Sequence, residues 1–255
     1  MHIKNSARNL SLALGFYSIT IFPSYYSLLL DVGSIRIGLI IGIIIFFLLA
    51  TPFGLRYFIT PKIIVINITI FILILLSYLV SLFIFPGVDH LRFILSLILL
   101  FSISVAAILV IKTLDVMENE YFHKTIIFGF YFLLLIGYFV FIRKFFFNYD
   151  LKDFLIFNEA SHFSICFGPF LFYAAYSSSK KFAFLYIIAT IFLALTLSNL
   201  TLLVTSLMVL LITFGSRQPL LFLLFIPIFF LSLIYLDTSY FLSRLSFSTT
   251  SDNTS

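Results

Sequence analysis

The chain has 255 residues, of which 62% are hydrophobic and only 10% are charged, and 36 of them are phenylalanine. A soluble domain of this size would not have that composition, so we interpret residues 1–255 as one all-α, polytopic integral membrane domain without a separate soluble catalytic domain. The net charge of +5 does not indicate nucleic-acid binding, because the lysines and arginines are scattered at the ends of apolar runs, as in membrane topology signals.

Six apolar runs are long enough to cross a hydrocarbon core of about 30 Å, which takes roughly 20 residues of helix. The first follows Lys4 and Arg8 and continues past Pro23, which favours a transmembrane helix over a cleavable signal peptide. The six predicted spans cover residues 10–30, 35–53, 63–85, 91–111, 125–142 and 159–176.

The apolar block from Phe182 to Phe214 is too long for one ordinary crossing, because a helix of that length would extend roughly 50 Å. We therefore divide it into two short spans that turn near Ser198–Asn199, and we place a ninth span at residues 220–236. An eight-span count fits the distribution of lysine and arginine equally well.

Both counts put the N-terminus in the cytoplasm and the loop of residues 143–160 outside it, following the positive-inside rule. The polar tail of residues 237–255 is interpreted as an exposed loop that is cut short.

The stretch Asn158-Glu159-Ala160-Ser161-His162-Phe163 opens the sixth predicted span. Asn158 suits the N-cap, which places the Glu159 carboxylate at the positive end of the helix dipole. His162 then lies one turn further along the same face. Such a pair could orient and deprotonate a hydroxyl group. A capping glutamate and an interfacial histidine packed against aromatic rings would have the same spacing, so both interpretations stay open.

Arg143 and Lys144 end the fifth predicted span on the outer side, where the positive-inside rule disfavours cations. A lipid-linked diphosphate would account for them, and so would snorkelling or pairing with Asp150 and Asp153. Arg244 is a further cation on the same side under the nine-span count.

Gly168-Pro169 in the sixth predicted span indicates a kink, which either frees a backbone carbonyl near mid-membrane or only serves packing. The sequence has no Gly-rich phosphate loop and no convincing metal-nucleotide motif. Cys166 is the only cysteine, which excludes a thiol metal cluster. We expect no metal and no soluble cofactor.

At these residues the chain resembles the bacterial O-antigen polymerases, which join the oligosaccharide repeat units of surface polysaccharides. Members often carry Glu-Pro-Ser-His-Phe at the start of a membrane helix, and residues 159–163 match it except that Ala160 replaces proline. The run Leu197-Ser198-Asn199-Leu200-Thr201 and the closing Arg244 with Asp252-Asn253-Thr254-Ser255 also look like later segments of the family. The resemblance covers residues 125–255.

The resemblance implies a GT-C-like membrane glycosyltransferase in the bacterial inner membrane. It would transfer an undecaprenyl-diphosphate-linked glycan to a sugar hydroxyl of a lipid-linked repeat unit at the periplasmic face, with a flippase and a chain-length regulator as pathway partners. Because members usually continue with further spans, we expect a truncated member. Our working hypothesis assigns acceptor activation to Glu159 and His162, and substrate or diphosphate binding to Arg143, Lys144, Arg244, Ser161 and Asn158.

Three alternatives stay open at this level. An O-antigen ligase would share the donor and the outer face. A flippase or other transporter should show buried mid-span charges and repeat-related halves, and few mid-span charges are found. A structural membrane protein would need neither Glu159 nor His162.

Overall fold

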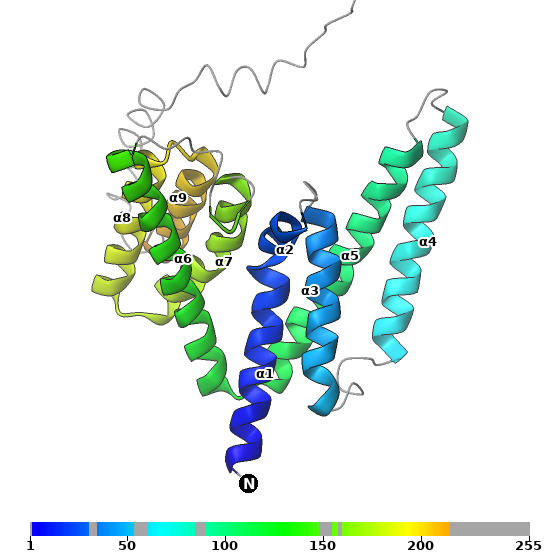
Figure 1. Cartoon of the computed structure of the whole chain (residues 1–255), viewed down its shortest axis with the longest axis horizontal. Helices are drawn as coiled ribbons and strands as arrows, with labels where there is room; N and C mark the ends of the chain where they lie inside the picture. The colour runs from blue at the N-terminus through cyan, green and yellow to red at the C-terminus, as the bar shows by residue number, and fades with distance from the viewer. Residues whose placement is uncertain are drawn as a thin grey trace, which may run out of the picture. The chain divides into compact units, whose positions relative to one another are not determined.

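The computed structural model, shown in Figure 1, describes residues 2–30, 35–53, 61–84, 90–147, 155–157 and 160–214. The predicted span at 220–236, the tail at 237–255 with Arg244, and the two motif residues Asn158 and Glu159 lie outside these ranges. The chain divides into an N-terminal unit, residues 1–128 with 155–158, and a C-terminal unit, residues 129–154 with 159–255.

The regular secondary structure of the described residues is helical, which confirms the all-α class. Each apolar run that was predicted as a span before residue 214 contains a helix. The elements are α1 (His2–Thr20), α2 (Pro23–Leu29), α3 (Ile35–Ala50), the short 3-10 helix η1 (Thr51–Phe53), α4 (Pro61–Ile84), α5 (His90–Val116), α6 (Asn119–Phe147), α7 (Ala160–Ser177), α8 (Lys180–Thr196) and α9 (Leu200–Phe214).

Two stretches of these helices are long and apolar enough to cross a bilayer, Ile94–Val116 in α5 and Asn119–Phe147, which is α6. The pair Ser6–Thr20 and Pro23–Leu29 would add a third crossing if it counts as one broken span. Ile35–Ala50 and Leu200–Phe214 are apolar, but helices of 16 and 15 residues extend only about 24 Å, less than the hydrocarbon core. The protein is therefore a helical membrane protein, while the nine-span count is not confirmed in the described part of the chain.

The first predicted span is not one straight helix. α1 and α2 meet at a bend of 70° between Thr20 and Pro23. Proline has no N–H to continue the α1 hydrogen-bond ladder, and its fixed φ suits the first turn of a new helix. The predicted span at residues 10–30 therefore corresponds to a bent pair of helices.

In the N-terminal unit, α3 packs closely against both α1 and α2. A Cβ on Gly42 would overlap the carbonyl oxygen of Ser18, and a Cβ on Gly38 would overlap that of Pro23. The Ser18 hydroxyl donates to the carbonyl oxygen of Gly42 at 3.0 Å. Small residues thus allow the backbones to touch, as is common between membrane helices.

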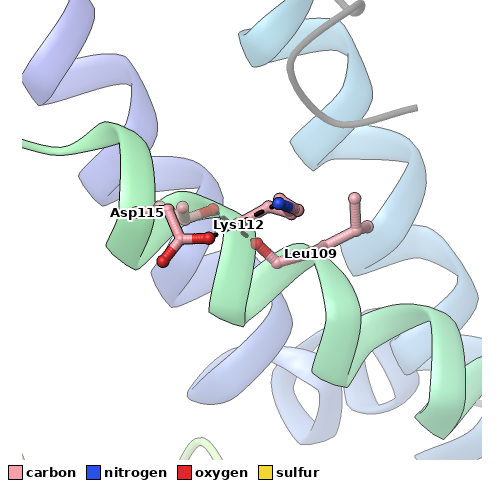
Figure 2. A network of polar contacts seen from close by, with 4 residues as sticks. Leu109, Lys112 and Asp115 are labelled. Atoms are coloured by element: carbon pink, nitrogen blue, oxygen red, sulfur yellow. Dashed lines mark hydrogen bonds and ion pairs between the residues drawn. The ribbon is translucent and has the colours of Figure 1, made fainter. Parts of the chain in front are cut away.

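The last turns of α5 carry the polar residues that end its apolar stretch (Figure 2). Lys112 Nζ lies 3.5 Å from Asp115 Oδ2, and the Thr113 hydroxyl donates to the carbonyl oxygen of Leu109 at 2.7 Å. Because the ion pair is exposed, it contributes at most about 1 kcal/mol. The ion pair lies at the polar end of the helix and does not hold the fold together.

The C-terminal unit consists of α7, α8 and α9, which pack against one another (Figure 1), and of α6 from Gly129 onward. Its centre is aromatic, because Phe163 stacks on Phe167 and Phe167 on Phe130, with 5.5 Å between ring centroids in each pair. All three rings are buried. α6 is also tied to α8 by the Tyr131 and Tyr186 hydroxyls, which lie 2.6 Å apart.

Two predictions about α7 and the apolar block can be compared with the structure. The block does divide near Ser198–Asn199, where α8 ends and α9 begins, which confirms the turn. Pro169 lies inside α7, which continues on both sides of it. Gly168 faces α9, since a Cβ there would lie 2.8 Å from a Thr205 methyl carbon. Close packing therefore accounts for this glycine.

Candidate functional site

The turn between α8 and α9 satisfies the last carbonyls of α8 with backbone hydrogen bonds. The Asn199 N–H donates to the carbonyl oxygen of Ala194 at 2.9 Å, and the Ser198 N–H donates to that of Leu195 at 3.1 Å. This is the Schellman pattern, in which one residue takes a left-handed conformation, and Ser198 has a φ of 51°. Asn199 therefore lies in the short turn after α8, which ends at Thr196, and directly precedes α9.

The side chain of Asn199 joins two helices at this turn. Its Oδ1 accepts from the Leu202 N–H at 3.0 Å, which makes it the N-cap of α9. Its Nδ2 donates to the carbonyl oxygen of Ala160 at 2.8 Å, in the first turn of α7. The residue is 5% exposed, so water does not compete well for either bond.

Lys144 reaches the same turn from the last turn of α6. Its Nζ donates to the carbonyl oxygen of Thr196 at 3.0 Å, at the C-terminus of α8. An ammonium group suits this position, because the helix dipole is negative there and the last carbonyls lack helical partners. An ammonium has three N–H donors, and this bond uses one of them.

These contacts bring several predicted site residues to one end of the C-terminal unit. Lys144 contacts the α8–α9 turn through Thr196, and the helix turn that contains Ser161 and His162 contacts it through Ala160. Arg143 precedes Lys144 in α6, which continues to Phe147. Both cations therefore lie in the last turns of a helix, beyond the predicted end of the span at residue 142.

His162 is partly buried in the first turn of α7. Its Nδ1 atom is buried and has no hydrogen-bond partner among the described residues. A neutral imidazole has one nitrogen that donates and one that accepts, so an unpaired Nδ1 can serve as either. Its neighbour Phe163 is fully buried, which anchors this turn of the helix in the unit.

The remaining predicted site residues cannot be placed in this cluster. Asn158, Glu159 and Arg244 lie outside the described residues. The pairing of Glu159 with His162 therefore stays a prediction from the sequence. Within the described ranges, no group of three histidine, cysteine, aspartate or glutamate side chains could hold a metal ion.

Asn199 and Thr196 were not predicted as site residues. A signal for Asn199 was present, since asparagine is among the best N-cap residues and here it interrupts an apolar block. The hydrogen bond from Asn199 to Ala160 could not be predicted from helix-capping preferences, because Ala160 is 39 residues away in the chain. The same holds for Thr196, which takes part through its backbone carbonyl.

The comparisons with known proteins do not identify the chain. No family model, no curated protein and no solved structure matches it.

Proposed function

We propose that this protein polymerises lipid-diphosphate-linked oligosaccharide repeat units by glycosyl transfer at the periplasmic face of the bacterial inner membrane. The observation that carries the proposal is the first turn of α7, where His162 has a buried Nδ1 without a partner in the described chain. Residues 160–163, which belong to the motif that resembles the O-antigen polymerases, form the first turn of this helix. The contact of Lys144 with the same end of the unit further supports the proposal.

In the proposed reaction, a sugar hydroxyl of the incoming repeat unit attacks the anomeric carbon of the growing glycan. A new glycosidic bond forms, and the bond from that carbon to the undecaprenyl diphosphate breaks. Glu159 and His162 orient the hydroxyl and accept its proton. The diphosphate leaves with the bonding electron pair.

The developing charge on the diphosphate is stabilised by cations in this scheme. Arg143 and Lys144 lie in the last turns of α6, and Arg244 would join them under the nine-span count. Lys144 can hold the Thr196 carbonyl and still direct further N–H donors to phosphate oxygens. Ser161 and Asn158 would bind the sugar or diphosphate beside them.

The proposal includes a GT-C-like membrane fold with about nine spans and a cytoplasmic N-terminus. It also includes two functional partners from the same pathway, a flippase that supplies the lipid-linked repeat units and a chain-length regulator. No soluble cofactor takes part, because the lipid diphosphate activates the donor sugar.

The test is complementation of a polymerase-null strain with the full chain and its variants. We expect Glu159→Ala and His162→Ala to reduce long O-antigen chains at least about 100-fold, the scale of a lost general base. His123→Ala, in the first turns of α6, is the matched control and should leave the ladder intact. Unchanged ladders for both motif variants at equal expression would refute the assignment.

A ligase-null strain that expresses the chain separates a polymerase from a ligase. Loss of a polymerase leaves a single repeat unit on the lipid A core, whereas loss of a ligase leaves none. If the wild-type chain restores glycan to the core of the ligase-null strain and His162→Ala does not, ligase activity replaces the proposal.

A further inference from the structure

We infer that Asn199 is a positioning residue for His162, because it holds the first turn of α7 against the start of α9. This inference rests on the proposed function for its catalytic consequence. The bonds that carry it, from Asn199 to Ala160 and from Leu202 to Asn199, lie entirely within the C-terminal unit.

The geometry at Asn199 requires both a donor and an acceptor in one short side chain. The backbone N–H of Leu202 can only donate, and the Ala160 carbonyl can only accept. These two partners fix which amide atom is oxygen and which is nitrogen. Aspartate and serine could replace the acceptor, but an ionised aspartate has no donor, and a serine hydroxyl is too short to satisfy both partners.

Through its bond to the Ala160 carbonyl, Asn199 fixes the position of the helix turn that carries His162. This carbonyl also accepts a hydrogen bond from the Ser164 hydroxyl at 2.9 Å. Ser164 is fully buried, and Phe163 beside it is buried in the aromatic centre of the unit. The helix turn around His162 is thus held by α9 at one end and by the aromatic centre at the other.

The placement of His162 matters because proton transfer requires a hydrogen-bond distance between base and hydroxyl. His162 lies two residues beyond Ala160, in the same turn, so a shift of the Ala160 carbonyl moves the imidazole as well. A displacement of about 1 Å at a catalytic group can reduce a rate by about 100-fold.

An N-cap role alone makes a different prediction from a positioning role. Asparagine, aspartate and serine are nearly equal as N-caps. If Asn199 only caps α9, Asn199→Ser behaves like the wild type. If it positions His162, Asn199→Ser keeps the stability of α9 and still releases the first turn of α7.

The experiment uses the full chain in lipid nanodiscs, with ¹³C-labelled alanine and ¹⁵N-labelled histidine. We expect Asn199→Ser and Asn199→Asp to shift the Ala160 carbonyl resonance and the His162 ring nitrogen resonances. Asn67→Ser, the same change in α4 of the N-terminal unit, is the matched control and should leave these resonances in place. In cells, Asn199→Ser should reduce long chains about tenfold to 100-fold at equal expression.

The outcomes distinguish this inference from the proposed function. Unshifted Ala160 and His162 resonances in Asn199→Ser would overturn the positioning role, even if His162→Ala abolishes the ladder. Shifted resonances with an undiminished ladder in Asn199→Ser, while His162→Ala loses it, would also overturn it. Intact ladders in both His162→Ala and Glu159→Ala refute the proposed function, and the resonances still decide whether Asn199 positions the histidine.

Discussion

At the scale of single residues, two adjacent positions in the α8–α9 turn are constrained in different ways. Ser198 is constrained by its backbone conformation, and Asn199 by a hydrogen bond to a distant helix. Ser198 takes a left-handed conformation, with a φ of 51°, that glycine adopts without steric cost. Asn199 next to it must be an amide, because it bonds to both Leu202 and Ala160. Glycine can therefore replace Ser198, whereas a residue without an amide side chain cannot keep both bonds of Asn199.

Ser198→Gly should raise the free energy of unfolding by up to about 1 kcal/mol. The left-handed conformation costs a non-glycine residue about 1–2 kcal/mol, which exceeds the extra chain entropy of glycine, about 0.5–1 kcal/mol. Ser198→Val should lower the free energy of unfolding by at least about 1 kcal/mol, because a β-branched side chain tolerates this conformation poorly. Unfolding in mixed micelles, followed by circular dichroism, measures both changes.

Ser178→Gly is the control for this prediction. Ser178 lies in the turn between α7 and α8 and does not have a positive φ. Glycine should therefore not stabilise the protein there. Equal effects of glycine at both positions would contradict the argument from backbone conformation.

At the scale of helices, close backbone contact holds the N-terminal unit together. Gly38 and Gly42 lie one turn apart on α3, and both meet carbonyl oxygens, of Pro23 and Ser18 respectively. A carbonyl oxygen in a helix cannot rotate away as a side chain can. The contact between α3 and its neighbours is thus sensitive to a single methyl group.

Gly42→Ala should lower the free energy of unfolding by about 1–3 kcal/mol, the usual cost of overpacking a tight interface. The added Cβ would push α1 away from α3 and weaken the Ser18 hydrogen bond to the Gly42 carbonyl. Unfolding in the same mixed micelles, followed by circular dichroism, measures the loss of stability. Ile44→Ala, at an exposed position on the same helix, should change stability by less than about 0.5 kcal/mol. A neutral Gly42→Ala variant would contradict the close contact.

At the scale of the whole molecule, apolar side chains are exposed in both units. Leu48 and Leu135 are 68% and 70% exposed, respectively. Water would make such surfaces costly, and lipid tails do not. In the C-terminal unit, the end of α6 and the start of α7 meet at the α8–α9 turn. Lys180 and Lys181 lie at the opposite end of α8, where that helix begins.

The proposed topology predicts that these two ends lie on opposite sides of the membrane. With Cys166 replaced by alanine, a cysteine at Phe146 should react with a membrane-impermeant maleimide added to intact spheroplasts. A cysteine at Lys181 should react only after permeabilisation. Both side chains are exposed, so burial does not protect either. Labelling of both positions from outside would contradict the predicted orientation.

Much of the helical architecture could be predicted from hydrophobicity along the chain. The turn at Ser198–Asn199 was predicted because the largely apolar block of 33 residues from Phe182 to Phe214 is too long for one crossing. The fifth predicted span ended at residue 142, whereas the helix α6 continues to Phe147. Hydropathy marks where side chains become polar, but lysine and arginine are good helix formers, so the helix continues through them.

The sequence by itself determined that this is a helical membrane protein, and it predicted that an acid, a hydroxyl and an imidazole open one of its helices. Only the tertiary structure revealed that Asn199 holds that helix through Ala160, and that Lys144 caps α8 through Thr196. The physical reason is that hydropathy and helix signals act between near neighbours in the chain. The two hydrogen bonds join residues 39 and 52 positions apart, and one end of each is a backbone carbonyl that every residue carries.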